Sequence, residues 1–90
     1  MTSQTWCRRA AVKETPVEAD LFLVVSDGGE IYHLNALGAA LWRLLAEPAS
    51  ETEASETLAL AFPELARAEI DADVRRFFAD LRQRGLLDRP

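Results

Sequence analysis

The residues best suited to nucleophilic or metal chemistry are His33 and Cys7, the only histidine and the only cysteine of the chain. No two-metal pattern and no four-ligand zinc pattern can be built from one residue of each kind. A cysteine activated by a histidine is formally possible, but no motif brings the two side chains together. The sequence also lacks both common glycine-rich phosphate-binding motifs. We therefore expect no catalytic residue, no metal site and no cofactor, and we expect that the protein is not an enzyme.

Simple structural roles account for the same side chains. Cys7 can act as a small hydrophobic residue near an N-terminal strand. His33 lies between Tyr32 and Leu34, which are candidates for the inner face of a strand, so His33 itself is expected on the solvent side or at an edge. The many carboxylates fall on predicted helix surfaces and turns, where they are usually solvated.

Length and composition indicate one globular domain. The chain has 90 residues, of which 49% are hydrophobic and 28% charged. We expect a single domain over residues 1–90, with residues 1–5 frayed, a β-sheet half over residues 6–34 and a three-helix half over residues 35–87. There is no apolar run of about 18 residues and no signal-peptide pattern, so no membrane association is expected. A lone cysteine cannot form an internal disulfide, which favours a reducing cytoplasm.

Charge is unevenly distributed along the chain. The net charge is −5, and Arg43 is the only basic residue between Glu14 and Glu64. The other basic residues lie near the N-terminus and in the last third. Affinity for nucleic acid comes mainly from neutralising phosphates, so the acidic total argues against a general nucleic-acid binder. A local basic strip remains compatible with this charge.

The first half of the sequence predicts a small antiparallel sheet. Leu21–Val25 is continuously apolar, as a central strand would be. Asp27–Gly29 is a hairpin signal, because glycine supplies the positive φ of tight turns. Glu30–Leu34 is the second arm of this hairpin. Trp6–Val12 is a candidate for the third strand, and Thr15-Pro16 marks a turn or a strand edge, because proline cannot donate to a ladder.

The second half predicts three helices. Asn35 is a suitable N-cap for a helix over residues 36–46, which shows an apolar face at Leu37, Leu41 and Leu45. The second helix opens on a capping box made by Ser50 and Glu53. Its expected apolar face consists of Ala54, Leu58, Ala61 and Phe62.

The third helix is predicted over residues 66–84. Gly85 fits the left-handed residue that ends many helices, and Leu86 and Leu87 are then expected to fold back on the core. The apolar stripe of this helix consists of Ile70, Val74, Phe77, Phe78 and Leu81.

Three landmarks in fixed order carry a resemblance to a known family. They are Leu34-Asn35 followed by Gly38-Ala39-Ala40-Leu41-Trp42, the capped middle helix, and the set Asp73-Val74, Phe77-Phe78, Leu81 and Gly85-Leu86-Leu87. Together they resemble the PqqD family, named for the pyrroloquinoline quinone biosynthesis protein D. Its domain type is also called the RiPP recognition element, after ribosomally synthesised and post-translationally modified peptides. The resemblance covers Val17 to Leu87, whereas Trp6-Cys7-Arg8-Arg9 departs from the family pattern and leaves the bounds of the first strand open.

The resemblance implies a winged-helix-like α+β fold, in which a small three-stranded antiparallel β-sheet is followed by three α-helices. It also implies a peptide chaperone that captures the leader segment of a precursor peptide by β-strand addition and presents it to a modifying enzyme, such as a radical-SAM protein or a leader peptidase. In the family the leader adds to the edge of the third strand and lies against the third helix. Carried over by motif, the strand edge is Glu30, Ile31, Tyr32, His33 and Leu34, and the helix wall is Asp71, Arg75, Phe78 and Arg82.

Independently of the resemblance, a small sheet must leave a free edge, which offers unpaired N–H and C=O groups to an added strand. Phe78 lies at the border of the apolar stripe, with Arg75 and Arg82 further round on the same side. The border could give a groove an apolar floor and a charged rim. Equally, Phe78 could belong only to the core, and the two arginines could simply face water.

Two alternative functions remain open. The same elements occur in winged-helix DNA-binding modules, whose recognition helix presents basic and amide side chains near its N-terminus. The third helix instead presents Glu69, Asp71 and Asp73 there, which would repel phosphate. The other alternative is a small structural subunit of a larger maturase complex.

Overall fold

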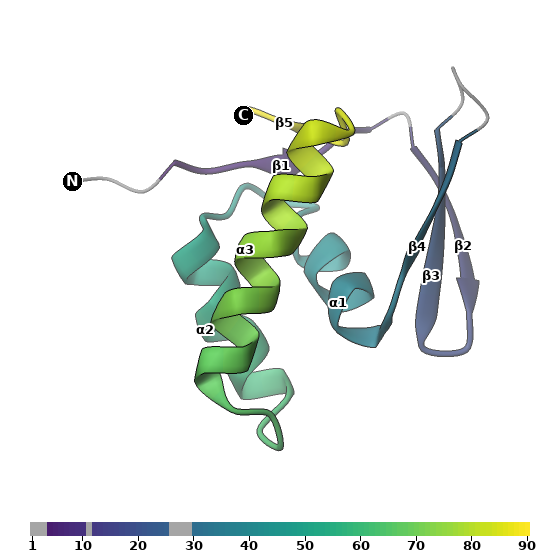
Figure 1. Cartoon of the computed structure of the whole chain (residues 1–90). Helices are drawn as coiled ribbons and strands as arrows, with labels where there is room; N and C mark the ends of the chain where they lie inside the picture. Colours follow the sequence, from purple (N-terminus) through teal and green to yellow (C-terminus); the bar gives the residue numbers. More distant parts are fainter. Residues whose placement is uncertain (1–3, 11, 26–29) are drawn as a thin grey trace.

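The computed structural model describes residues 4–10, 12–25 and 30–90, and it has an α+β architecture in which three helices stand beside a small sheet (Figure 1). The hairpin turn expected at Asp27–Gly29 lies outside the described residues. The elements in chain order are β1 (Cys7–Arg8), β2 (Val12–Val17), β3 (Asp20–Val25), β4 (Glu30–Leu34), α1 (Ala36–Leu44), α2 (Glu51–Ala61), α3 (Arg67–Gln83) and β5 (Leu87–Asp88).

The three-stranded sheet is antiparallel in the order β2-β3-β4. β3 is central, as the apolar run predicted, and its pairing with β4 sets Leu23 opposite Tyr32 and Leu21 opposite Leu34. Leu21, Leu23 and Leu34 are buried on the face that packs against the helices. The strand period of two therefore gives the sheet an inner face toward α1 and an outer face without a helix over it.

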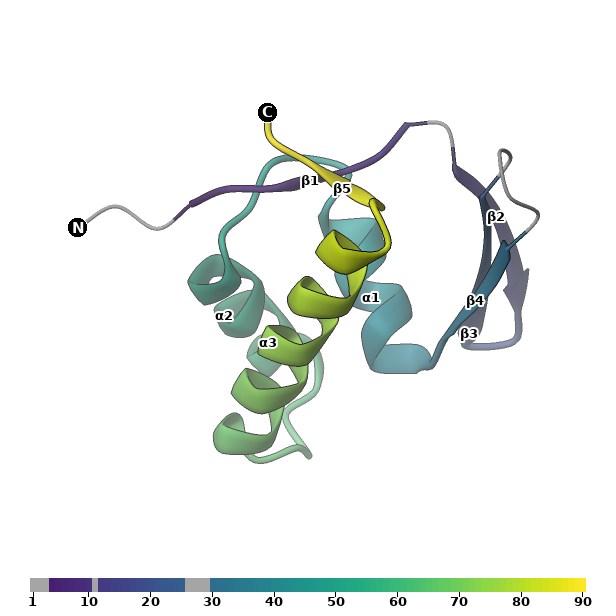
Figure 2. The same ribbon diagram turned by 45° about the horizontal axis from the view of Figure 1, so that its top comes forward.

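The first strand of this sheet differs from the sequence prediction. β2 runs over Val12–Val17 and includes Pro16, so the sheet does not use the expected segment Trp6–Val12. Cys7–Arg8 instead pairs with Leu87–Asp88 in a separate two-stranded sheet, beyond the C-terminal end of α3 (Figure 2). The local pattern could not reveal this pairing, because the partner lies at the far end of the chain.

The predicted caps of the first two helices are confirmed. The Gly38 N–H donates to the Asn35 side chain at 2.9 Å, and α1 ends at Leu44, two residues before the predicted end. In α2, Ser50 and Glu53 form the reciprocal capping box, with donor–acceptor distances of 2.9 and 3.1 Å. Ala61, expected on the apolar face of α2, is exposed at the end of the helix.

The predicted end of α3 is also confirmed. Gly85 has a φ of 71°, and Leu86 N–H donates to the Leu81 carbonyl at 2.8 Å, while Gly85 N–H donates to the Arg82 carbonyl at 3.0 Å. These two bonds form a Schellman motif, which satisfies carbonyls at the helix end. Leu86 and Leu87 then turn back and are both buried, as expected.

The hydrophobic core lies among the three helices and the inner face of the sheet. Trp42 of α1 and Phe78 of α3 are its largest fully buried side chains. All five residues of the apolar stripe predicted for α3 are buried. In the part of the chain that the structure describes, no helix combines the length and the hydropathy needed to cross a membrane.

Candidate functional site

β4 is an edge strand with one side unpaired within the described sheet. Its only strand partner is β3, so every second residue of Glu30–Leu34 directs its N–H and C=O groups away from the sheet. Ile31 and His33 lie two residues apart and share one direction. The Ile31 side chain is 65% exposed, which is unusual for a large aliphatic residue. β4 therefore presents a template on which an extended peptide could pair.

The opposite edge of the sheet is less suited to pairing. β2 contains Pro16, which has no N–H to donate, and the exposed charged residues Lys13 and Glu14. Proline and charged side chains are devices by which proteins protect edge strands from pairing with other chains. β4 contains no proline, so it is the better suited of the two edges to pair with an added strand.

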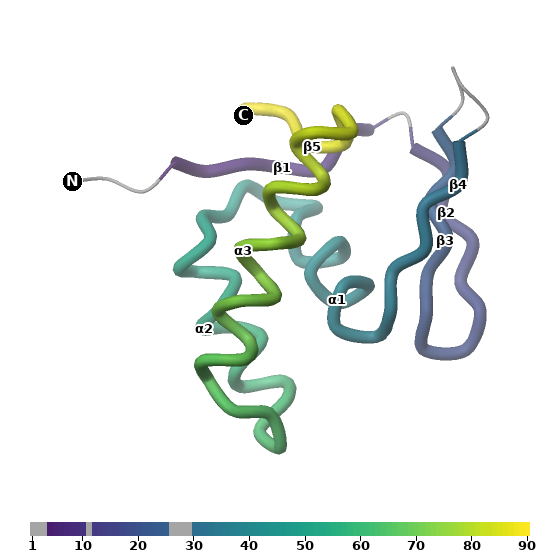
Figure 3. The backbone as a smooth tube through the Cα atoms, in the orientation of Figure 1, coloured from purple at the N-terminus to yellow at the C-terminus, as the bar shows by residue number. Residues whose placement is uncertain are grey.

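A tight junction holds β4 against the helices. A single capping residue, Asn35, separates β4 from α1, and the chain turns sharply at this point (Figure 3). The missing side chain of Gly38 makes room for the ring of Phe77, since a β-carbon built on Gly38 would lie 3.0 Å from two ring carbons. This close approach fixes the position of α3 relative to the end of β4.

Side chains of α3 and of its C-cap residue Arg84 reach across to β4 and define a cleft, for which we use the name β4–α3 cleft. Arg84 donates to the Glu30 carboxylate at 2.9 Å, and the Tyr32 hydroxyl donates to Asp80 at 3.5 Å. The Arg84 guanidinium also lies 4.3 Å from the centre of the Tyr32 ring. A hollow of about 500 Å³ opens here, lined by Glu30, Asp80, Gln83 and Arg84. Charged and polar groups thus line the hollow beside the free edge, and the Tyr32 ring contacts two of them, Asp80 and Arg84.

The electrostatic environment of Tyr32 reflects this arrangement. Burial raises the pKa of the Tyr32 hydroxyl above its ordinary value, and the neighbouring Asp80 carboxylate raises it further, whereas Arg84 lowers it. The phenol is therefore protonated at neutral pH and can donate its hydrogen bond to Asp80.

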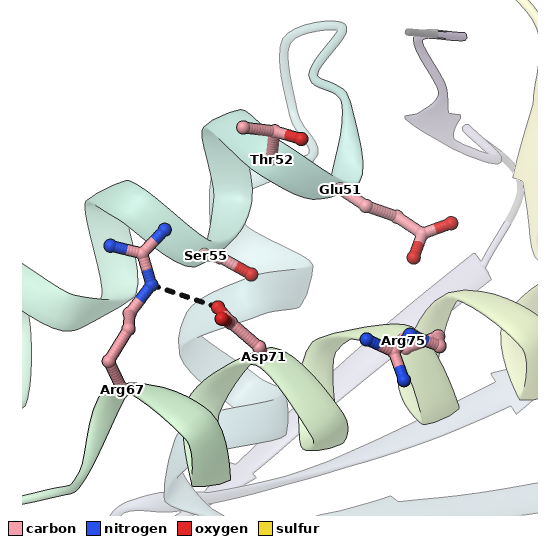
Figure 4. Close-up of a pocket in the computed structure, with 6 residues that line it drawn as sticks. All are labelled: Glu51, Thr52, Ser55, Arg67, Asp71 and Arg75. Atoms are coloured by element: carbon pink, nitrogen blue, oxygen red, sulfur yellow. Dashed lines mark hydrogen bonds and ion pairs between the residues drawn. The ribbon is translucent and has the colours of Figure 1, made fainter.

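The helix wall predicted from the sequence does not line this cleft. Asp71 and Arg75 lie on the side of α3 that faces α2, where the Arg67 guanidinium donates to Asp71 at 2.9 Å. Figure 4 shows them around a separate polar hollow, lined by Glu51, Thr52, Ser55, Arg67, Asp71 and Arg75. The hydrogen bond from Arg67 holds the pKa of the Asp71 carboxyl below its ordinary value.

The other two predicted wall residues are also away from β4. Arg82 lies on the same side of α3 as Asp71 and Arg75, with its guanidinium 5.4 Å from the centre of the Trp6 ring. Phe78 is 0% exposed and belongs to the core, so it offers no surface to a ligand in this structure. All four residues therefore lie away from the β4–α3 cleft, and their part in peptide binding stays a prediction.

The residues that do face β4 lie on the opposite border. At about 100° per residue, Phe77, Asp80 and Arg84 follow one another along one side of α3. Asp80 and Arg84, which line the β4–α3 cleft, were not predicted from the sequence. A stripe has two borders, and only the packing of α3 against α1 and β4 decides which of them meets the sheet edge.

The histidine and the cysteine have structural partners. His33 Nε2 lies 2.8 Å from an Asp20 carboxylate oxygen, and its ring stacks on Phe22 with 4.8 Å between centres. The Cys7 thiol donates to the Asp88 carbonyl at 3.6 Å, in the β1–β5 pair. Across residues 4–10, 12–25 and 30–90, no group of three or more His, Cys, Asp and Glu side chains is arranged to hold a metal ion.

Comparisons with known proteins agree with the fold. Residues 20–87 match the family model described as coenzyme PQQ synthesis protein D (PqqD). No curated protein matches the sequence. One similar solved structure is "TbiB1 in Complex with the TbiA(beta) Leader Peptide", at 23% identity and a TM-score of 0.75, covering 91% of this chain and 94% of that one. Another is "Lasso peptide synthetase B1 complexed with the leader peptide", at 17% identity and a TM-score of 0.73, covering 92% and 96%.

Proposed function

The chain belongs to the PqqD family, and we propose that it is a peptide-binding adaptor that captures the leader segment of a ribosomally synthesised precursor peptide. In this proposal the leader adds as a strand to β4 and is presented to a modifying enzyme. The adaptor itself performs no chemistry and works in the cytoplasm, where precursor peptides are made. The modifying enzyme is a maturase such as a radical-SAM protein or a leader peptidase.

The observation that carries the proposal is the free edge of β4 beside the β4–α3 cleft. Backbone pairing along an edge gives affinity for extended peptides in general, and adjacent pockets give specificity for their side chains. Here the edge comprises Glu30–Leu34, and the cleft offers the Tyr32 ring with the charged groups of Asp80 and Arg84. Both elements of peptide capture by strand addition are therefore adjacent.

The similar solved structures support the same reading. Each of the two is described as a complex with a leader peptide, and each shares the fold of this chain over more than nine-tenths of its length. A fold alone does not fix a function. Combined with family membership and a free edge in this chain, it makes leader capture the best-supported function.

The test is an NMR titration of backbone amides with the precursor peptide encoded near a maturase in the same genome. We expect the largest shifts at residues 30–34 and on the side of α3 that carries Phe77, Asp80 and Arg84. Shifts confined to α2 or to residues 4–10 would contradict the proposal. Shifts around Arg75 and Arg82 alone would instead favour the wall that the resemblance implied.

Proline substitutions test the pairing directly. Ile31→Pro and His33→Pro each remove one N–H from the strand, and both positions point toward the same edge. If that edge is the free one, each variant should keep its fold and lose peptide binding. Tyr32→Pro is the matched variant, because its N–H points the opposite way and the substitution should break the β3–β4 ladder. Circular dichroism separates loss of fold from loss of binding.

Alanine substitutions at the same positions provide the control. Because the backbone makes the pairing bonds, Ile31→Ala and His33→Ala should weaken peptide binding only partly. A complete loss of binding in the alanine variants would mean that side chains, and not the strand edge, carry the interaction.

A further inference from the structure

We propose that the β4–α3 cleft selects a leader segment that carries a basic side chain opposite Asp80, flanked along the strand by apolar residues. The inference rests on the proposed strand addition and specifies which peptides that addition favours. It follows from the charges that line the cleft, from the ring that already holds a cation there, and from the exposed apolar surface on the other face of β4.

Strand geometry divides the side chains of an added peptide into two sets. Successive residues of a strand point to opposite faces, so alternate peptide residues would lie beside Tyr32 on the inner face or beside Ile31 and His33 on the outer face. The inner-facing residue points into the cleft, toward α3. The two faces of β4 thus meet two different kinds of environment.

The inner environment carries an uncompensated negative charge. The lining groups are Glu30, Asp80, Gln83 and Arg84, of which Gln83 is neutral. Arg84 is paired with Glu30 at 2.9 Å, whereas Asp80 forms no ion pair with any described residue and accepts the neutral Tyr32 hydroxyl at 3.5 Å. A cationic group on the peptide would give Asp80 the charged partner that it lacks, and a charge-assisted hydrogen bond is stronger than a neutral one.

The Tyr32 ring can contact both the methylene chain and the charged end of a lysine or arginine side chain. It is half-buried, and its face already lies 4.3 Å from the Arg84 guanidinium. Lysine and arginine can lay their methylene stems along apolar surface while the charged head reaches a polar partner. A peptide cation with its head at Asp80 could therefore lie against the ring beside the Arg84 guanidinium, whose own charge is paired with Glu30.

The outer face of β4 is uncovered and is apolar around Ile31, whereas His33 beside it contacts the Asp20 carboxylate at 2.8 Å. Ile31 is 65% exposed and pairs across the sheet with the half-buried Val24. The next pair on this face is His33 with Phe22, whose rings stack. Cross-strand neighbours of β-branched or aromatic residues stabilise a sheet when they too are apolar. The peptide residues on either side of the basic one should therefore be aliphatic or aromatic.

The net charge of the chain also favours a basic peptide. A net charge of −5 would attract a basic peptide over a distance and repel an acidic one, most strongly at low salt. The protein would thus favour basic peptides both through faster association and through a more stable complex.

The experiment uses three synthetic extended peptides in which valine alternates with lysine, norleucine or glutamate. Binding to the intact chain is followed by NMR and by isothermal titration. We expect the lysine peptide to bind about tenfold more tightly than the norleucine peptide, and the glutamate peptide to bind most weakly. The advantage of lysine should shrink as salt is added. Equal affinities, or a preference for glutamate, would overturn the inference.

Variants locate the effect at Asp80. Asp80→Asn should abolish the preference for lysine over norleucine, and Asp80→Lys should reverse the order of lysine and glutamate. Glu56→Gln is the matched control, because Glu56 is exposed on α2 and removal of its charge changes the net charge equally, so the variant should keep the preference for lysine over norleucine. Loss of the preference in Glu56→Gln as well would indicate a general effect of net charge and would contradict a role for Asp80.

The outcomes for the inference and for the proposed function can be told apart. If all three peptides cause equal shifts in the amide signals of residues 30–34, strand addition is supported and the proposed selectivity is wrong. If no peptide, including the genomically encoded precursor, shifts residues 30–34, strand addition itself is wrong and the inference fails with it.

Discussion

The Gly38 backbone lies so close to the Phe77 ring that a β-carbon on Gly38 would stand 3.0 Å from two ring carbons and 3.3 Å from the Leu34 β-carbon. Gly38 is buried in the first turn of α1, and the Phe77 ring is only 6% exposed. Three elements, β4, α1 and α3, therefore meet at a position where no side chain fits without movement.

Gly38→Ala should accordingly destabilise the protein. Alanine in a helix is favoured over glycine by about 1 kcal/mol, but forcing a methyl group into a packed core costs about 1–3 kcal/mol. We expect a net loss, measured as a lower midpoint of urea unfolding. The matched control is Ala79→Gly at an exposed position of α3, which should lose about 1 kcal/mol through helix propensity alone. A more stable Gly38→Ala variant would show that the ring is free to move.

Truncation of the core should have larger effects. Leu41 is 0% exposed, and Phe77 packs at the junction just described. Leu41→Ala or Phe77→Ala should each reduce the free energy of unfolding by about 2–5 kcal/mol, as large-to-small changes in cores do. Thermal melts that show a loss below about 1 kcal/mol for both variants would contradict the assigned helix faces.

Alkaline pH should weaken the fold through Tyr32. The folded state raises the pKa of Tyr32, chiefly through burial and then through Asp80, so it favours the protonated phenol. The resulting contribution to stability is fully present below the ordinary tyrosine pKa of about 10 and is lost as the pH rises through the higher pKa of the folded state. Tyr32 is the only tyrosine, so an ultraviolet titration reports its ionisation directly.

Two variants should shift the pKa of Tyr32 in opposite directions. Asp80→Asn removes a charge that raises the pKa of Tyr32, and the pKa should fall. Arg84→Gln removes a charge that lowers it, and the pKa should rise further. Identical titration curves for the two variants would place Tyr32 outside the influence of both groups.

Duplex DNA should not bind at physiological salt with affinity tighter than the millimolar range. The N-terminal half of α3 carries Glu69, Asp71 and Asp73, and the net charge of the chain is −5, so phosphates meet repulsion where a recognition helix would need cations. Fluorescence anisotropy with a random duplex is the measurement. A micromolar affinity that falls steeply with salt would instead favour the winged-helix DNA-binding alternative.

Local signals predicted the helix boundaries well. The caps at Asn35 and Ser50 and the left-handed Gly85 each depend on hydrogen bonds within a few residues, and the structure confirms all three. The apolar stripe of α3 was equally predictable, because a buried helix face repeats with the helical period.

Long-range placement was less predictable. Nothing in the pattern around Cys7–Arg8 indicates that this segment pairs with Leu87–Asp88 and leaves Val12–Val17 as the first strand of the sheet. The free edge at Glu30–Leu34 came from the family resemblance and from the need of a small sheet to end somewhere. The residues of α3 that face this edge could not be assigned, because periodicity identifies the apolar stripe of a helix but not which neighbouring element packs against each border of the stripe.

The pairing of β1 with β5 has a consequence for covalent fusions. The two ends of the described chain leave the domain from one strand pair, with Cys7 opposite Asp88. Beyond this pair, Arg89 lies against the Trp6 ring, which also contacts Arg82 on the side of α3 away from the cleft. A catalytic domain joined to either terminus would therefore begin on that same side of α3, and the effective concentration of a captured peptide at its active site would depend on whether the linker can reach around α3 and not on which end was joined.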